Sequence, residues 1–148
     1  MRCRAWIQLS RLGNKASRLL RVLAIAASAV LLVGCNGGTV DRHALTNDAA
    51  TLDSIACEGA LLAHNTARGR TTANFTREQA EELAIQASNL ADALAKRPAL
   101  ASIERRVRAK ARQSARVAAT LHRLQDNPSD RDVAATVERQ LARLGGCP

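Results

Sequence analysis

The chain has 148 residues, with 22 basic and 13 acidic side chains and a formal net charge of +9 at pH 7. Six of the basic residues and none of the acidic ones precede Cys35, so the remainder of the chain carries a charge of only +3. With one Trp, one Phe and no Tyr, the chain has too few rings to stack sugars or single-stranded nucleic acid, or to cage a quaternary ammonium group. The composition therefore argues against nucleic acid as a partner and against these ligand classes.

Residues 1–34 have the three parts of an export signal. The basic flank contains Arg2, Arg4, Arg11, Lys15, Arg18 and Arg21. An uncharged apolar run, 22–33, follows, and Gly34 is the small residue before Cys35. The run is shorter than the roughly 20 apolar residues of a membrane-spanning helix, which disfavours the alternative of a permanent N-terminal span.

The sequence Leu32-Val33-Gly34-Cys35 resembles the lipobox of bacterial lipoprotein precursors, which signal peptidase II cleaves. The resemblance implies that residues 1–34 are removed as a signal peptide and that Cys35 carries lipid, palmitate included. It also implies export and anchoring to the cell membrane or outer membrane, with the domain facing the periplasm or the cell exterior. In that family an Asp after the lipidated cysteine favours retention at the inner membrane. Asn36 stands there instead, which implies outer-membrane delivery in a host with two membranes.

Two cysteines remain for the folded part, because Cys3 falls in the leader and Cys35 takes the lipid. In an exported protein the pair Cys57 and Cys147 predicts one disulfide within the domain, and two free thiols or a bond between chains are the alternatives. The bridge closes nearly the whole domain, and the loop-entropy model values a closure of that length at about 4 to 5 kcal/mol.

Residues 35–47 are expected to form the lipidated cysteine and a flexible tether, because they contain Gly37-Gly38 and little hydrophobic periodicity. The domain, residues 48–148, is therefore expected to stay close to the bilayer. Its first helix is predicted over 48–68, with Gly69 ending it. The face that this helix buries is predicted to contain Leu52, Ile55, Ala56, Gly59 and Leu62.

A second helix is predicted to begin at Thr76, after a loop over 70–74. Thr76 and Gln79 have the spacing of a capping box, and Phe75 can pack onto Ala80. A narrow apolar seam, typical of two packed helices, consists of Ala80, Leu83, Ala87, Leu90 and Leu94.

Pro98 is predicted to open a third helix, since proline is tolerated in a first helical turn. Its buried face consists of Leu100, Ile103, Val107, Ala111, Ser114, Ala118 and Leu121. Asn127-Pro128 predicts the start of a fourth helix, which Gly145-Gly146 ends. Its inward residues are Val133, Val137, Leu141 and Leu144. Short connections favour antiparallel neighbours, so we expect an all-α, up-down bundle of four helices; the alternative is a three-helix bundle with the first segment draped across it.

One side of the predicted third helix is uniformly basic. At about 100° per residue, this arginine stripe lies opposite the buried face and consists of Arg105, Arg108, Arg112, Arg116 and Arg123. Arginines four residues apart repel each other by a few tenths of a kcal/mol per pair. An external anionic partner can offset this repulsion, as can acidic residues of the two preceding helices; an ordinary solvated face is the remaining alternative. Those acids are Asp48, Asp53, Glu58, Glu78, Glu81, Glu82 and Asp92.

The sequence contains no HExxH, nucleophile elbow, P-loop or dinucleotide fingerprint. His43, His64 and His122 are far apart and lack the spacing of metal ligands. We therefore expect no enzyme activity, cofactor, bound metal or small-molecule substrate.

The expected function is that of a cell-envelope lipoprotein whose helical domain acts by protein–protein contact, as a scaffold, accessory or pilot subunit. The general layout of the chain, a lipid anchor followed by a small helical domain, is similar to that of the pilotins, small helical lipoproteins that escort secretion pores. The alternative is binding of anionic lipid or an envelope polymer through the arginine stripe.

Overall fold

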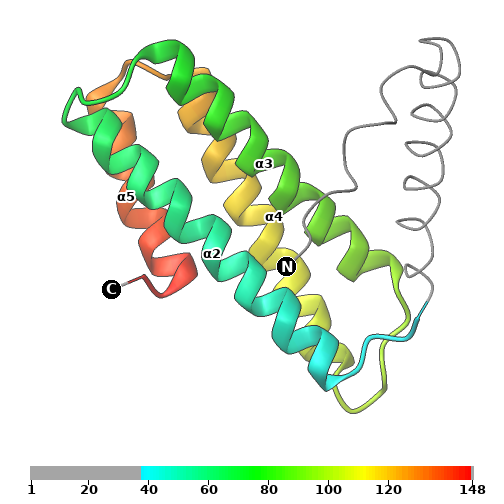
Figure 1. Cartoon of the computed structure of the whole chain (residues 1–148). Coiled ribbons are helices and arrows are strands. Elements are labelled where there is room, and N and C mark those ends of the chain that lie inside the picture. Colours follow the sequence, from blue (N-terminus) through cyan, green and yellow to red (C-terminus); the bar gives the residue numbers. More distant parts are fainter. Residues whose placement is uncertain (1–37, 148) are drawn as a thin grey trace, which may run out of the picture. The chain divides into compact units, whose positions relative to one another are not determined.

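The computed structural model describes residues 38–147, which contain four helices (Figure 1). These are α2 (Arg42–Ala67), α3 (Ala73–Lys96), α4 (Glu104–Asp126) and α5 (Arg131–Gly145). Each helix packs on the next, α5 returns to pack along α2, and the closest associations are α3 with α4 and α2 with α5. This confirms the all-α, up-down bundle of four helices. The first helix is a full member of the bundle, so the three-helix alternative is wrong.

Helix α2 begins earlier than its sequence pattern predicted. The Asp41 side chain caps it by accepting a 2.8 Å hydrogen bond from the N–H of Ala44. Val40 is fully buried and Leu45 is buried as well. Residues 40–47, expected to be part of the tether, therefore belong to the bundle. The predicted inward face of α2 is confirmed, and Gly69 follows the helix with a φ of 65°.

The start of α3 also differs from the predicted capping box. Thr72 is the N-cap, and its hydroxyl accepts from the N–H of Phe75 at 3.3 Å. Thr76 lies one turn inside the helix, fully buried, with its hydroxyl 3.1 Å from that of Thr66 and 3.0 Å from that of Thr71. Because α3 already begins at Ala73, Thr76 lies inside the helix and is not its cap. The predicted seam is confirmed at four positions, and Leu90 is partly buried.

Pro98 does not open α4, which begins at Glu104. Proline disfavours the helical conformation in the residue before it, and Arg97 is accordingly extended, with φ −77° and ψ 135°. Residues 97–103 form a connection that pairs with Val40, and in it Leu100 is 49% exposed, contrary to its predicted place in the buried face. Apart from Ala111, which is half-buried, the other residues predicted for this face are buried.

Helix α5 takes its cap from Asp130, whose carboxylate accepts from the N–H groups of Asp132 and Val133 at 2.9 and 3.0 Å. The predicted start at Asn127-Pro128 is therefore wrong, and Asn127 instead ends α4. Gly146 ends α5 in the left-handed conformation, with φ 62°, as expected. Of the four predicted inward residues, Val137 and Leu141 are fully buried, and Val133 and Leu144 are partly buried.

The apolar interior consists of two clusters. The larger one draws on all four helices, and the smaller one contains Val40, Leu45, Leu94, Ile103 and Val107. The smaller cluster contains no residue of α5, so this end of the bundle is built from α2, α3, α4 and the strand-like segment at Val40. In the larger cluster Gly59 allows close packing: a Cβ there would lie 2.7 Å from Leu121 and 2.9 Å from Leu141.

Candidate functional site: the arginine stripe of α4

The predicted lipidation site and its leader, residues 1–34 and Cys35, lie outside the residues that the structure describes. They stay predictions. The domain that follows, Gly38–Pro148, forms a compact unit of its own.

Cys57 of α2 and Cys147, just after α5, form the predicted disulfide. Their sulfur atoms lie 2.11 Å apart and their Cα atoms 5.6 Å apart, a typical Cα separation for a disulfide. The bond fastens the C-terminal end of the chain to the middle of α2. The pairing is within one chain, so the alternatives of free thiols and an intermolecular bond do not describe this structure.

The five arginines of the predicted stripe all lie in α4, and all five are exposed. The opposite side of the same helix carries Val107, Ser114 and Leu121, which are buried at 2%, 0% and 0% exposure. Helix α4 is therefore buried on one side and carries exposed arginines on the other.

Most of this stripe has no carboxylate partner within the described part of the chain. Arg108 forms an ion pair with Glu104, one turn earlier in the same helix. Arg123 contacts the amide oxygen of Gln140 at 3.5 Å, a neutral partner. Arg105, Arg112 and Arg116 form no ion pair with any carboxylate among residues 38–147.

None of the predicted acids of the preceding helices forms an ion pair with the stripe, and most of them have other partners. Asp48 binds Arg97 at 2.6 Å, and Asp53 lies 3.9 Å from Lys110. Asp92 binds Lys96 at 2.9 Å. Glu58 accepts a hydrogen bond from the hydroxyl of Ser54, and Glu82 accepts one from the side-chain amide of Gln86. Glu78 and Glu81 form no ion pair in the described residues. In this fold these acids therefore do not neutralise the arginines of the stripe.

Helix α5 adds a further arginine to this side of the molecule. Gln140 contacts Arg123, and the carbonyl oxygen of Leu144 accepts a 2.5 Å hydrogen bond from Gln113, so this stretch of α5 runs beside the middle of α4. Arg143 is exposed and stands three residues after Gln140, on the same side of its helix. It therefore lies near the level of Arg116. The sequence pattern missed Arg143, because it does not show which side of α5 faces α4.

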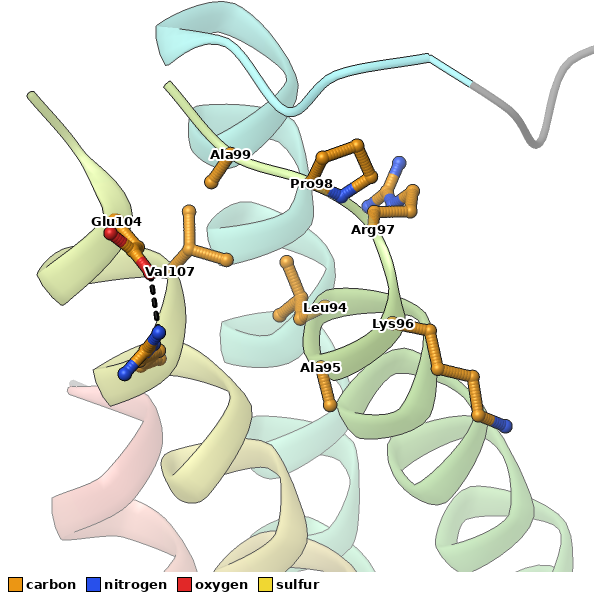
Figure 2. A pocket seen from close by; sticks show the side chains of 9 residues that line it. Leu94, Ala95, Lys96, Arg97, Pro98, Ala99, Glu104 and Val107 are labelled. Atoms are coloured by element: carbon orange, nitrogen blue, oxygen red, sulfur yellow. Dashed lines mark hydrogen bonds and ion pairs between the residues drawn. The ribbon is translucent and has the colours of Figure 1, made fainter. Parts of the chain in front are cut away.

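A hollow of ≈ 310 Å³ lies where the end of α3, the following connection and the start of α4 meet (Figure 2). Leu94 and Val107 line its apolar side. Each basic residue that lines it is paired with a carboxylate, in the pairs Lys96–Asp92, Arg97–Asp48 and Arg108–Glu104. The hollow is therefore close to neutral, and Arg105, Arg112 and Arg116 do not line it.

The histidines take part in local contacts. The Nδ1 atom of His64 lies 2.9 Å from a carboxylate oxygen of Glu138, which links α2 to α5, and His122 contacts Gln125 at 2.8 Å. His43 is exposed at the start of α2. Within residues 38–147, no group of three or more His, Cys, Asp or Glu side chains is arranged to hold a metal ion. None of the helices described has both the length and the apolar character needed to span a bilayer.

No protein-family model matches the chain, and neither the curated proteins nor the solved structures contain a significant match to it.

Proposed function

We propose that this protein is an exported, lipid-anchored, non-catalytic binding module, and that its arginine stripe binds an anionic surface. The observation that carries the proposal is the absence of any ion pair from Arg105, Arg112 and Arg116 to a carboxylate among residues 38–147. Phospholipid headgroups at the membrane that holds the anchor are the nearest anions, and an anionic envelope polymer presents the same chemistry.

The energetics of α4 support this proposal. Arg108 and Arg112, and again Arg112 and Arg116, are like charges one turn apart, and each pair destabilises the helix by about 0.2 to 0.5 kcal/mol. A basic residue near an anionic membrane contributes about 1 kcal/mol of binding free energy. Contact of the stripe with such a surface therefore outweighs the repulsion within the helix.

Co-sedimentation of the domain, residues 36–148, with anionic and neutral vesicles across a salt series tests the proposal. We expect binding to anionic vesicles alone, weakening as salt rises, because exposed charges are screened beyond about 8 Å at physiological ionic strength. Replacing Arg108, Arg112 and Arg116 with Glu should abolish it. The matched control replaces Arg68, Arg70 and Arg77, which are exposed around the α2–α3 turn, and changes the net charge equally.

Three outcomes are informative. Loss of binding in the α4 variant alone supports the stripe as the binding surface. Equal losses in both variants mean that net charge rather than this surface determines binding. Retained binding in the α4 variant, with the domain still folded, overturns the proposal.

A protein partner is the second candidate, and the outer side of α2 favours it. Between Thr46 and Leu61 the charged side chains of α2 that reach the surface are Glu58 and the half-exposed Asp53, and Leu61 is 62% exposed. Protein interfaces are depleted in charge at their centre. A photo-crosslinking residue at Leu61 should then give one discrete adduct in intact cells, and the same residue at Arg77 should not. Smeared or absent adducts at both positions would contradict this candidate.

The proposed anchor has a separate test. Replacing Cys35 with Ala should release the protein from the membrane fraction and abolish its role without altering the fold of the domain. Cells that carry this variant and behave normally would show that the role does not depend on the anchor.

A further inference from the structure

The polypeptide enters the bundle at the connection between α3 and α4. Val40 is fully buried and pairs in parallel with Ala99. Its N–H donates to the carbonyl oxygen of Pro98 at 2.8 Å, and its carbonyl oxygen accepts from the N–H of Leu100 at 3.3 Å. Figure 2 shows Pro98 and Ala99 in this extended stretch. Val40 is thus fixed to the connection formed by residues 97–103.

The short distance along the chain between Cys35 and Val40 limits where the domain can lie. Five residues, even fully extended, reach about 17 Å. Helix α2 has 26 residues and is therefore about 39 Å long. An anchor at Cys35 then keeps the end of the bundle that contains the α3–α4 connection at the bilayer, while the α2–α3 turn at Gly69 can lie far from it.

The exposed surface of this end is suited to the boundary between headgroups and acyl chains. Leu100 is 49% exposed, and Pro98, Ala101 and Ser102 beside it are exposed and uncharged. Arg42, Arg105 and Arg106 are exposed at this end and form no ion pair with a carboxylate among residues 38–147, whereas Lys96 and Arg108 are paired with Asp92 and Glu104. Of the nearby acids, Asp48, Asp92 and Glu104 are already in ion pairs, and Asp41 caps α2. An apolar tip with a surplus of positive charge around it is typical of segments that rest on anionic membranes.

We propose that residues 98–103 are the membrane-contacting end of the domain and that Leu100 inserts into the anionic bilayer that holds the Cys35 lipid. The inference rests on the proposed lipid anchor. It goes further in naming the segment that touches the bilayer: α4 begins there, and the arginine stripe runs from that end of the domain.

A tryptophan introduced in place of Leu100 tests this in the lipidated protein. The chain has a single Trp, Trp6, in the segment predicted to be removed, so Leu100→Trp gives the mature protein one emitting residue. The matched control is Leu61→Trp, at a site 62% exposed and about 28 Å along α2 from Arg42. Both variants, purified with their lipid and reconstituted into nanodiscs of mixed neutral and anionic lipid, are measured with brominated lipid and with acrylamide.

We expect the emission of Leu100→Trp to shift to shorter wavelength, to be strongly quenched by brominated lipid and to be protected from acrylamide. Leu61→Trp should show the opposite pattern. This inference alone is overturned if, in disc-bound, lipidated protein, the indole of Leu100→Trp stays open to acrylamide or that of Leu61→Trp is the one quenched by brominated lipid. A mature protein whose mass lacks the lipid on Cys35 overturns the anchor and, with it, this inference. Leu100→Glu is a second variant, and it should weaken vesicle binding of the 36–148 domain.

Discussion

The hydroxyl of Ser114 donates a 2.8 Å hydrogen bond to the carbonyl oxygen of Ala87, joining α4 to α3 inside the bundle. Both residues are fully buried. The bond satisfies a polar side chain at an otherwise apolar position of α4, and it fixes the two helices relative to each other along their axes. The stripe lies on the other side of the same helix, where its five arginines are exposed.

Ser114→Ala should lower the free energy of unfolding by about 1 to 2 kcal/mol, because a buried hydrogen bond between helices is lost. The matched control is Thr120→Ala, since Thr120 donates to the carbonyl of Arg116 within its own helix. Urea denaturation of both variants measures the difference. An equal or larger loss in Thr120→Ala would contradict the importance of the contact between helices.

Removal of the Cys57–Cys147 bond by a double Ala substitution should lower the free energy of unfolding by about 2 to 5 kcal/mol, the usual range for a small exported domain. Dithiothreitol should destabilise the unmodified domain by a similar amount. It should leave the double variant unchanged, which makes that variant the control for other effects of the reductant. Thermal unfolding of the unmodified domain that is insensitive to dithiothreitol would contradict the bond.

A domain that begins at Asp48 should be less stable than one that begins at Gly38. The shorter chain lacks Val40 and Leu45, both buried in the smaller apolar cluster. At about 1.5 to 3 kcal/mol for each buried side chain, we expect a loss of roughly 3 kcal/mol or more in urea denaturation. Val40→Ala in the longer chain separates the contributions and should cost about 2 kcal/mol. Equal stability of the two chains would show that residues 38–47 do not pack as described.

Replacing an arginine with glutamine should have opposite effects on the stability of the domain at Arg112 and at Arg97. Arg112 has a like charge one turn away on either side and no carboxylate partner in the described residues, so Arg112→Gln should raise stability by a few tenths of a kcal/mol at low salt. Arg97 binds Asp48 with both side chains 22% exposed, so Arg97→Gln should lower stability by about 1 kcal/mol.

The same pair of variants connects stability with binding. Arg112→Gln should bind anionic vesicles more weakly despite its higher stability, which is the pattern expected of a residue retained for contact rather than folding. Arg97→Gln should bind as the unmodified domain does. If Arg112→Gln is instead destabilised, an internal partner holds that guanidinium group.

Several features could be predicted from the sequence because they depend on local periodicity or on simple counting. The 3.6-residue repeat of α2 identified Leu52, Ile55 and Leu62 as buried, and the seam of α3 was identified in the same way. Two cysteines left over in a chain predicted to be exported identified the disulfide. Glycine tolerates the left-handed conformation, so Gly69 and Gly146 marked helix ends. The lipobox at Cys35 stays a prediction.

The starts of the helices were decided by the tertiary structure. A threonine caps a helix only where the helix begins, and α3 begins before Thr76, which is buried against the hydroxyls of Thr66 and Thr71. In the same way Pro98 lies in an extended stretch rather than opening a helix, because Val40 pairs beside it. These outcomes depend on residues distant in the sequence, which local patterns do not describe.

Whether the arginines of the stripe have carboxylate partners was also decided by the tertiary structure. The sequence determined that five arginines share one side of a helix, because the helical repeat alone fixes that arrangement. Which carboxylates come within reach depends on which helices are neighbours and at what axial level, and the packing of the bundle sets both. That packing pairs Asp48 with Arg97 and Asp53 with Lys110, and it leaves most of the stripe to solvent.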